Sequence, residues 1–432
     1  MKIILVSDWF LPRLGGVELQ IRDLAAELAS AGHHVHVVTT TPADPSAQGS
    51  LQTGSVALPD GVSVHRLDVP LFQRTGITLS RRAGPAMRGL LHTLEPDVVH
   101  IHASVCSTAA LAGAWAADRL RLPIVVTFHS VLGVHRHLLR GFDVAFGWSR
   151  WPHVFSAVSG ALAQEVAWLA PGRTVEVLPN GLDPDDWMTV PVPGVQDELR
   201  LVSVFRLQVR KRGVALLRVV AAAAKRLKGI RRVRLTVIGD GPERRRMEAE
   251  ARRLGIASAV EFAGYLPRPV IRERFARADA FVLVSVLESF GIAALEARAA
   301  GLPVVARRDT GMASLLEQGR EGLLAGSDAG VVDALVRLGT DGVLLARITR
   351  NNREVAPSVS WTSTVARHLE LYERALDGAG CRGQRGELLG GGLGGSPVRD
   401  RSEARSAAAE EVDHLPHRSQ RAGSRPRAAV PA

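Results

Sequence analysis

Two glutamates, Glu288 and Glu296, are separated by seven residues at a point where the character of the sequence changes. Residues 280–286 before them are apolar and rich in valine, which is typical of a buried parallel strand. Residues 292–300 are rich in alanine and leucine, which favours a helix. We therefore expect Glu288 in the loop at the carboxyl end of a strand, and Glu296 within the helix that follows.

The start of that helix offers a place for an anion. Ligands of open parallel sheets bind beyond the carboxyl ends of the strands, and the first N–H groups of a helix have no partner within it. Phe290, Gly291 and Ile292 would therefore present free N–H groups beside the glutamates. The arrangement predicts a site for a sugar nucleotide. The alternative is that neither glutamate binds a ligand. Glu288 would then be stabilised by the dipole of the helix that it precedes, and Glu296 would lie on a solvated face of that helix.

A basic loop, residues 205–213, follows the first strand of the same half of the chain and is predicted to lie beside this site. Arg206 provides a fixed guanidinium and Lys211 a compact ammonium, a combination that suits a diphosphate whose charge grows as it departs. Only four of the 54 basic residues are lysines, which makes Lys211 distinctive. The alternative is a solvated basic loop.

Two glycine-containing turns precede predicted helices. Gly15 and Gly16 would place bare amides at the start of a helix over residues 19–31, where a phosphate or oxyanion could bind. Gly239 ends a strand and begins a turn into a helix, and we include it among the candidate nucleotide-sugar-binding residues. Neither turn matches the GxGxxG dinucleotide fingerprint, so a plain turn explains each of them as well.

Histidines and aspartates provide further candidates. His129 follows a predicted strand and is expected to face the cleft between two domains, although a lone histidine is often structural. His100 and His102 lack a third ligand, which argues against a metal site. Asp183 and Asp185 match a loose Asp-x-Asp pattern of metal-dependent sugar transferases, but they follow Asn-Gly and are interpreted as turn residues. We predict no metal site.

Apolar strands and helical segments alternate along most of the chain, which indicates doubly wound parallel α/β sheets. A proline- and glycine-containing break separates two such series. We predict an α/β fold with one Rossmann-like domain over residues 1–190, a second over 191–360, a further helix over 361–377 and a disordered tail over 378–432.

Composition restricts the class of protein. The chain has 432 residues, of which 46% are hydrophobic, enough for two domains with their own cores. Two cysteines provide neither a disulfide framework nor a metal cluster and indicate a reducing compartment. No segment approaches the ~20 apolar residues of a membrane span, and the N-terminus has the pattern of a strand instead of a signal peptide. We expect a cytoplasmic protein whose net charge of +11 suits an anionic partner.

Together these residues resemble the family-4 retaining glycosyltransferases of the GT-B fold, in which two facing Rossmann-like domains enclose a nucleotide-sugar. The resemblance covers about residues 1–377 and depends on the order and spacing of several motifs. These are residues 15–18, 158–159, 179–183, 206–213, 239–242, 288–296 and 301–305. By the same resemblance, the last predicted helix would cross back onto the first domain.

The resemblance implies a role for each candidate. Glu296 would hold the ribose hydroxyls, Arg206 and Lys211 the diphosphate, and Glu288 the hydroxyls of the donor sugar. The remaining candidates are the amides of Phe290, Gly291 and Ile292 for sugar and phosphate, Gly16 for diphosphate or acceptor, and His129 for the reacting sugar. The chain departs from the family at Phe205, where many members have glycine, and by the extra Arg212, so the diphosphate loop is where the geometry is expected to differ.

The implied reaction moves a hexose (N-acetylglucosamine, mannose or glucose) from a UDP- or GDP-sugar to a hydroxyl acceptor with retention, and needs neither a cofactor nor a metal. Residues 6–12 and 97–104 are similar to the phosphatidylinositol N-acetylglucosaminyl and mannosyl transferases, which implies a lipid or small-molecule acceptor. Several arginines fall where such enzymes meet lipid and would hold an anionic membrane surface, giving a peripheral location, unless they form a solvated face. They are Arg74, Arg81, Arg82, Arg88, Arg136 and Arg140.

Two other functions are considered. A nucleic-acid-binding protein would explain the basic composition, but the basic residues are spread along the chain without interleaved aromatic residues, so we predict no nucleic-acid partner. A sugar-nucleotide epimerase of related fold is the alternative among enzymes.

Overall fold

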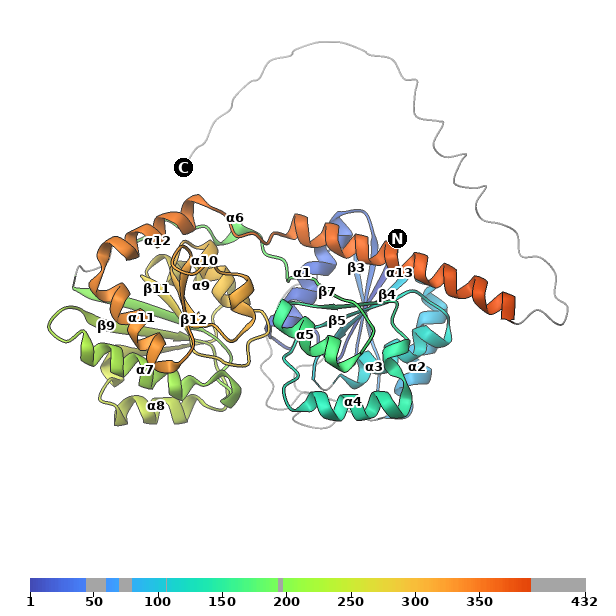
Figure 1. Ribbon diagram of the computed structural model, residues 1–432, viewed down its shortest axis with the longest axis horizontal. Helices are drawn as coiled ribbons and strands as arrows, with labels where there is room; N and C mark the ends of the chain where they lie inside the picture. The colour runs from blue at the N-terminus through green and yellow to red at the C-terminus, as the bar shows by residue number, and fades with distance from the viewer. Residues whose placement is uncertain (44–59, 70–79, 106, 193–196, 390–432) are drawn as a thin grey trace, which may run out of the picture. The chain divides into compact units, whose positions relative to one another are not determined.

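The computed structural model describes residues 1–43, 60–69, 80–105, 107–192 and 197–389 (Figure 1). Residues Met1–Gly383 form one compact unit that contains two parallel sheets. Of the remaining residues, only the end of the last helix is described.

The first sheet has seven parallel strands in the order β3-β2-β1-β4-β5-β6-β7. The strands are β1 (Lys2–Ser7), β2 (His34–Thr39), β3 (Val62–Arg66), β4 (Val98–Ala103), β5 (Ile124–Phe128), β6 (Val154–Ala157) and β7 (Val175–Val177). The helices between them are α1 (Gly16–Ser30), α2 (Ala83–Leu94), α3 (Thr108–Arg119), α4 (His135–Phe146) and α5 (Gly160–Leu169). The parallel pairing places the carboxyl ends of all these strands at one edge.

The second sheet has six parallel strands in the order β10-β9-β8-β11-β12-β13. The strands are β8 (Glu198–Val204), β9 (Arg232–Ile238), β10 (Val260–Gly264), β11 (Ala280–Leu283), β12 (Val304–Arg307) and β13 (Gly322–Ala325). The helices are α7 (Gly213–Arg226), α8 (Arg244–Arg253), α9 (Arg268–Ala276), α10 (Ile292–Ala299), α11 (Asp328–Thr340) and α12 (Gly342–Glu354), with the short α6 (Pro184–Trp187) before β8.

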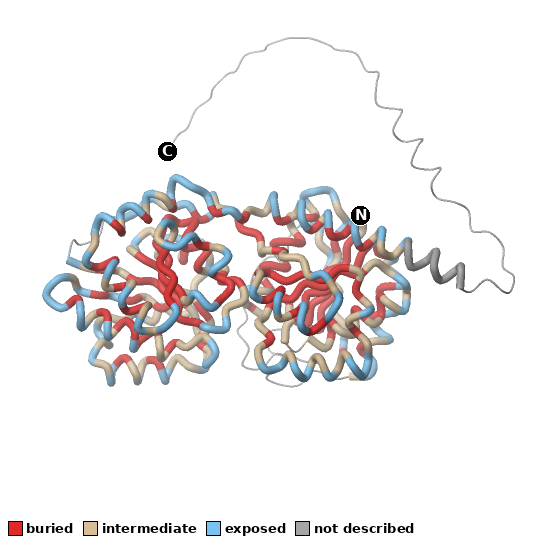
Figure 2. Tube along the Cα trace, in the orientation of Figure 1, coloured by how far each residue is buried: buried red, intermediate tan, exposed pale blue. Residues whose placement is uncertain are grey.

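Both sheets are buried on both faces, as their continuous apolar strands require (Figure 2). In β1, for example, Ile3 and Leu5 pack in the cluster that contains α1, whereas Ile4 and Val6 pack in the cluster that contains α2 and α3. Alternate residues of a strand point to opposite faces, so an apolar run can fill two cores. The prediction of an α/β fold with two parallel, Rossmann-like sheets is confirmed.

Several elements were not predicted from the sequence. They are α4, β13, α11 and α12. No residue of helix α4 is fully buried, although Leu139 and Phe142 pack against the core from its edge. Strand β13 has only four residues and begins with glycine, which is too little pattern for a strand to be recognised. The strand before Glu288 also ends earlier than predicted, at Leu283.

The last helix, α13 (Trp361–Leu389), packs on the first sheet. Leu371, Tyr372 and Ala375 belong to the same buried cluster as Ile3 and Leu5 of β1. The Tyr372 hydroxyl lies 2.9 Å from Nδ1 of His100 on β4. These contacts make α13 part of the core of the first sheet.

Helix α13 is longer than predicted. The helix continues to Leu389, beyond the expected end at residue 377, so the prediction of disorder from residue 378 was wrong for 378–389. No proline interrupts this segment, and its glycines are spaced among helix-forming residues. The rest of the predicted tail, residues 390–432, lies outside the described residues. Among the described helices, none has the length and hydropathy needed to cross a membrane.

We predict that α13 is required for stability. Truncating the fully buried Tyr372 to alanine should lower the free energy of unfolding by about 3–5 kcal/mol, because it opens a cavity and leaves Nδ1 of His100 without a partner. Tyr372→Phe, which removes only the hydroxyl, should cost ~1–3 kcal/mol. Urea unfolding followed by circular dichroism measures both.

The matched control is Arg374→Ala on the same helix, whose half-exposed ion pair with Glu176 should contribute less than ~1 kcal/mol. Equal losses in Tyr372→Ala and Arg374→Ala would show that α13 does not contribute through this packing.

Candidate functional site

The structure brings the basic loop and Glu288 into direct contact. Lys211 lies in the turn after β8, and its Nζ donates to Oε2 of Glu288 at 2.6 Å with both side chains mostly buried. Arg206, in the same loop, donates from Nη2 to the carbonyl of Leu14, which precedes α1. Burial lowers the pKa of Arg206, Glu18 opposes this and Arg210 adds to it. The two predicted diphosphate-binding cations therefore lie at the carboxyl edges of the strands.

The extra Arg212 does not compete for this position. Its guanidinium donates to both carboxylate oxygens of Asp328, at 2.9 and 2.7 Å, and to the carbonyl of Val284. Arg212 is therefore directed toward the start of α11. Phe205, the other departure from the family, is buried in the core of the second sheet. The loop is thus anchored on both sides of Lys211.

The N-terminus of α10 supplies the predicted free amides. Within the described residues, the N–H groups of Phe290, Gly291 and Ile292 make no hydrogen bond in the folded chain. Gly291 has φ of 90°, and a Cβ there would collide with the sulfur of Met312. Only glycine fits this close approach, which turns the chain so that successive amides point outward.

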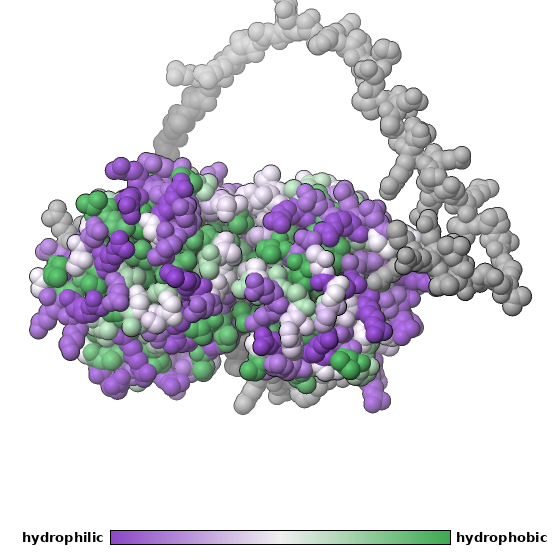
Figure 3. Space-filling view, viewed as in Figure 1, coloured by the Kyte–Doolittle hydropathy of each residue, from purple (hydrophilic) through white to green (hydrophobic). Residues whose placement is uncertain are grey.

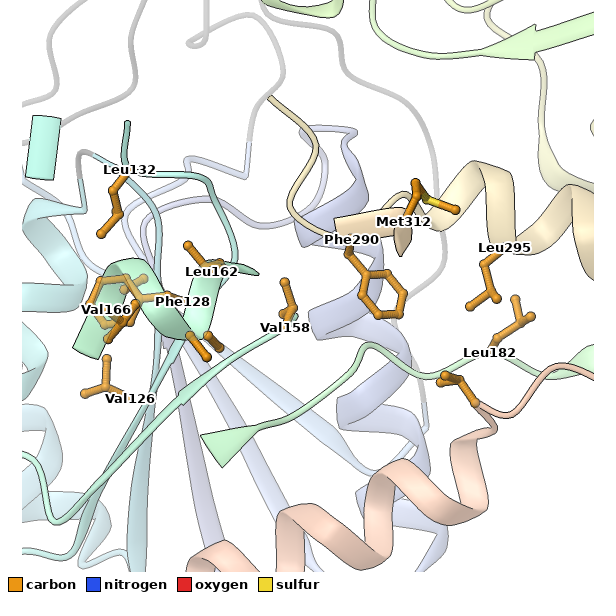
Figure 4. Close-up of a cluster of buried hydrophobic side chains, with 14 of the residues drawn as sticks. Val126, Phe128, Leu132, Val158, Leu162, Val166, Leu182, Phe290, Leu295 and Met312 are labelled. Carbon is orange, nitrogen blue, oxygen red and sulfur yellow. The ribbon is translucent and has the colours of Figure 1, made fainter. Parts of the chain in front are cut away.

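The side chain of Phe290 serves as an anchor for these amides. It is buried and belongs to the same apolar cluster as Val158 and Leu182 of the first half of the chain (Figure 4). The neighbouring Ser289 donates from Oγ to the carbonyl of His129 at 2.6 Å. The loop before α10 is therefore held against the carboxyl edge of the first sheet.

Glu296 lies on the second turn of α10 and is almost completely buried. Burial raises its pKa to about 7; the charge of Arg268 opposes the shift and that of Asp23 adds to it. Arg268 lies 3.9 Å from Glu296 and forms a closer ion pair, at 2.7 Å, with Asp23 on α1. The Glu296 carboxylate is therefore only partly compensated and can accept hydrogen bonds from hydroxyl groups.

The two candidate glycines differ in their surroundings. A Cβ on Gly239 would collide with the carbonyl of Phe205, and the Gly239 N–H already donates to the carbonyl of Gly264 at 2.7 Å. Gly239 therefore allows the basic loop to approach closely. A Cβ on Gly16 would meet no atom within 4 Å, which leaves the first turn of α1 open to a ligand.

His129 follows β5 and its side chain is buried. Its Nε2 lies 2.9 Å from Nδ1 of His102 on β4. Burial, with a contribution from His368, lowers the pKa of His129 to about 3, so the ring is neutral.

Within the described ranges, no three His, Cys, Asp or Glu side chains are close enough to hold a metal ion. Asp183 accepts from the N–H of Asp185 at the start of α6, as expected for turn residues.

Several residues at this site were not singled out from the sequence. Ser289 lies inside the Glu288 motif, but its bond to His129 joins residues 160 positions apart. Arg268 follows a proline after β10 and reaches Asp23 and Glu296 only through the tertiary fold. Neither carries a local signal beyond its position near the carboxyl end of a strand.

Two parallel sheets that present cations, free helix amides and a buried carboxylate at their carboxyl edges define a class, the nucleotide-sugar-dependent glycosyltransferases of the GT-B fold. Comparison with known families agrees. The profile described as Glycosyltransferase Family 4 matches residues 14–186, and the profile described as Glycosyl transferases group 1 matches residues 192–355. The chain belongs to the family-4 glycosyltransferases. It is an enzyme, a hexosyltransferase, and the nucleic-acid and epimerase alternatives are not favoured.

The chain is similar to curated glycosyltransferases over most of their length. It is 30% identical to the D-inositol 3-phosphate glycosyltransferase 2 of Catenulispora acidiphila, over 84% of this chain and 91% of that protein. It is 26% identical to the gpi3 subunit of the phosphatidylinositol N-acetylglucosaminyltransferase of Schizosaccharomyces pombe, over 85% and 80% of the two chains.

Among solved structures, HepE of Anabaena in complex with UDP and glucose matches with a TM-score of 0.66 at 22% identity. The match covers 86% of this chain and 98% of that one. At this level of identity the likeness establishes the fold.

Six fully buried ionisable groups link stability to pH in opposite directions. The neutral histidines are His100, His102, His129 and His368, and burial lowers the pKa of each, to about 3 for His129 and about 4 for His368. Burial raises the pKa of Asp8 to about 6 and of Glu296 to about 7. Below pH 6.5, the four histidines take up protons when unfolding exposes them to water. Between about pH 4 and 6, the two acids release protons when the protein unfolds.

We predict a net loss of stability as the pH falls from 6.5 to 5. Four histidines outweigh two acids, so unfolding takes up about two protons and the free energy of unfolding should fall by on the order of 2 kcal/mol per pH unit. His368→Gln should reduce this slope by up to ~1.4 kcal/mol per pH unit. Urea unfolding at pH 7.5, 6.5 and 5.5 provides the slope.

His34→Gln, at an exposed position, is the control and should leave the slope unchanged. A stability that is constant or rises between pH 6.5 and 5 would contradict the prediction.

Proposed function

We propose that this enzyme transfers a hexose from a UDP- or GDP-sugar to a hydroxyl acceptor, with retention at the anomeric carbon and without a metal ion. The observation that carries the proposal is the contact between Lys211 and Glu288 beside the free amides of α10. A cation, a carboxylate and an anion-binding helix start meet there, and a sugar diphosphate offers one partner for each.

The proposed binding mode follows the chemistry of each group. The carboxylate of Glu296 accepts from the ribose hydroxyls, and Arg206 and Lys211 bind the diphosphate. The amides of residues 290–292 bind phosphate and sugar, and Glu288 accepts from the hydroxyls of the donor sugar. Because Gly16 has no side chain, a substrate can approach the start of α1. His129 contacts the sugar that reacts.

The two cations, Arg206 and Lys211, assist cleavage of the bond to the diphosphate. When the bond between the anomeric carbon and the diphosphate oxygen breaks, negative charge develops on the leaving diphosphate. Arg206 and Lys211 stabilise that charge more than they stabilise the bound donor, which lowers the barrier. The departing phosphate oxygen takes the proton of the acceptor hydroxyl, and the acceptor oxygen forms its bond to the anomeric carbon on the face from which the diphosphate leaves, so the configuration is retained. Two fixed cations serve here in place of a metal.

Relatives support the choice of substrates. HepE, with the same fold, is known in complex with UDP and with UDP-glucose. Two relatives are named for an inositol phosphate and a phosphatidylinositol acceptor. We therefore propose a UDP-sugar as the first donor to test and a phosphorylated inositol, free or in a lipid, as the first acceptor.

Donor binding is predicted to depend on pH through Glu296. The ribose diol hydrogen-bonds to the ionised carboxylate, whose pKa before binding is about 7, so UDP affinity should fall as the pH is lowered from 8 to 6. Glu296→Gln should weaken UDP binding about tenfold or more at pH 8 and flatten this dependence. Lys211→Ala should mainly lower kcat. Calorimetry with UDP and GDP, each with its sugar and in the presence of a chelator, measures the affinities, and initial-rate assays with the sugar nucleotide measure kcat.

Glu296→Gln also serves as the control. Any pH dependence that comes from titration of the UDP phosphates persists in this variant. Binding of neither nucleotide by the wild-type protein would remove the proposed function. If the nucleotides bound only in the presence of a divalent cation, the proposal that the enzyme works without a metal ion would be wrong.

A membrane surface is proposed as a partner on account of α4. Leu138, Val144 and Phe146 are 75%, 78% and 62% exposed on this helix, although they are apolar. Figure 3 shows hydrophobic residues among polar ones on this side of the first half of the chain. Exposed apolar side chains with basic neighbours are typical of helices that lie in a membrane interface. These exposed apolar residues were not predicted from the sequence.

The predicted lipid-contacting arginines have different surroundings. Arg81, Arg82 and Arg88 are exposed around the start of α2, and Arg74 lies outside the described residues. Arg136 stacks on Trp168, and Arg140 donates to the carbonyl of Leu169. Arg136 and Arg140 therefore support the position of α4, and in our proposal the exposed arginines of α2 meet anionic lipid.

Replacing Leu138, Val144 and Phe146 together by serine should lower the partition coefficient onto vesicles of phosphatidylcholine and phosphatidylglycerol at least tenfold. The reason is that apolar area no longer leaves water on binding, and tenfold corresponds to about 1.4 kcal/mol. Sedimentation of vesicles with bound protein measures the change.

Val343→Ser, which is 81% exposed on α12, is the matched control and should leave the partition coefficient unchanged. Equal binding of the triple variant and wild type would refute the role of α4.

A further inference from the structure

His102 and His129 form a hydrogen-bonded pair of imidazoles at the carboxyl edge of the first sheet. His102 is the fifth residue of β4, His129 directly follows β5, and the two rings share a hydrogen bond of 2.9 Å between Nδ1 and Nε2. Their ring centroids are 5.2 Å apart. Neighbouring parallel strands hold both residues, so the pair is fixed by the sheet.

Both rings are neutral because they are buried together with two further histidines. Burial lowers the pKa of His102 well below its usual value, and His100 and His129 add to this. The fourth ring, His368 of α13, donates from Nδ1 to the carbonyl of Thr364 at 2.7 Å, so its Nε2 carries no proton. A positive charge on any of the rings would be costly here.

The remaining nitrogen of each ring has no partner. Nε2 of His102 and Nδ1 of His129 are buried without a hydrogen bond within the described structure. Both residues line a small cavity of about 10 Å³ between α1, the residues after β7 and the start of α13. That volume accommodates about one water molecule or hydroxyl group. An unpaired buried polar atom costs about 1–3 kcal/mol, so this arrangement is stable only when a ligand group or water completes it.

Two of the other polar side chains around this cavity, Thr127 and Gln20, are already paired. Thr127 Oγ1 bonds to His100 and Ser156 at 2.7 and 2.6 Å, and Gln20 donates to the carbonyl of Gly181. Neither is therefore expected to satisfy the free nitrogens. The two imidazoles keep unpaired nitrogens that can meet a hydroxyl.

The pair obeys a simple rule of proton counting. A neutral imidazole has one N–H and one bare nitrogen, and the shared hydrogen bond uses one proton. If His102 donates, its own Nε2 is bare and Nδ1 of His129 carries a proton. If His129 donates, its Nδ1 is bare and Nε2 of His102 carries a proton. The two free nitrogens are therefore always of opposite kind, so the tautomer of His129 is linked to the tautomer of His102.

His129 is also connected to the donor-binding loop. Its carbonyl accepts from Ser289, the residue after Glu288, and Glu288 is paired with Lys211. With Nε2 engaged by His102, Nδ1 is the only side-chain atom of His129 that can bond to a substrate.

We propose that His102 is a positioning residue that fixes the orientation and the tautomer of His129, and thereby the hydrogen bond that His129 makes to a hydroxyl of the reacting sugar. The inference rests on the proposed function, in which His129 meets that sugar. His102 acts only through His129 and touches no substrate.

Three variants test the inference in the full-length protein, with UDP-glucose as donor probe. His102→Phe keeps the ring and its contact with His100 but removes both nitrogens. It should lower kcat at least tenfold and leave the Kd for UDP within twofold of wild type. His102→Asn restores a hydrogen-bonding group near the position of Nδ1 and should recover kcat to within about threefold. His100→Asn, on the same strand without a bond to His129, is the matched control and should reduce stability without changing kcat.

A spectroscopic measurement separates positioning from a general loss of structure. Long-range ¹⁵N–¹H correlation spectra of histidine-labelled protein report which nitrogen of His129 carries the proton, with His129→Asn to assign the signal. Wild type should show one dominant tautomer, and His102→Phe should show a mixture or the other tautomer. His100→Asn should retain the wild-type tautomer.

The inference is overturned if His102→Phe retains the kcat of wild type, if His102→Asn is as impaired as His102→Phe, or if the His129 tautomer is unchanged in His102→Phe. These outcomes differ from failure of the proposed function, which would appear as wild-type protein that binds neither UDP nor GDP. In that case the spectra still decide whether His102 controls His129.

Discussion

Parallel strand pairing is the constraint on which the rest of this structure depends. Because every strand of both sheets runs in the same direction as its neighbours, each loop that follows a strand emerges at the same edge of its sheet. Lys211, Glu288 and His129 are far apart in the sequence, yet each follows a strand and so reaches that edge. The apolar strands that are needed to bury both faces thus also determine where polar side chains can gather.

At that edge the cations are incompletely neutralised. Arg13 and Arg206 are partly buried near Arg210, with Glu18 as the partly compensating acid, and burial lowers the pKa of both arginines. Among the described residues, Lys211 is paired with Glu288 alone. Bringing like charges together in a partly buried region is unfavourable unless an anion completes it. The electrostatics of the folded chain therefore favour a ligand with at least two negative charges, which a diphosphate provides.

Much of the fold and part of the site were predictable from the sequence. Alternating strands and helices indicated the two sheets, and local patterns placed Glu288, Phe290 and Lys211 in loops after strands. The position of the basic loop beside Glu288 was an inference from topology, and the structure adds that Lys211 donates to Glu288. The bond from Ser289 to the carbonyl of His129 could not be predicted, because it depends on how two loops from different sheets meet. Helix α4 was also not predicted, and it contacts the core only from the edge, through Leu139 and Phe142.

The buried histidines show how the same sheet edge balances stability against function. Apolar residues could fill the space around His100, His102 and His368 at lower cost, because neutral imidazoles bring polar atoms that must each find a partner. His100 finds two partners, in Tyr372 and Thr127, and so joins α13 to the sheet. His102 and His129 satisfy only one another and leave one nitrogen each unpaired. The difference between these neighbours on one strand supports our proposal that His100 belongs to the core and that the His102–His129 pair meets the substrate.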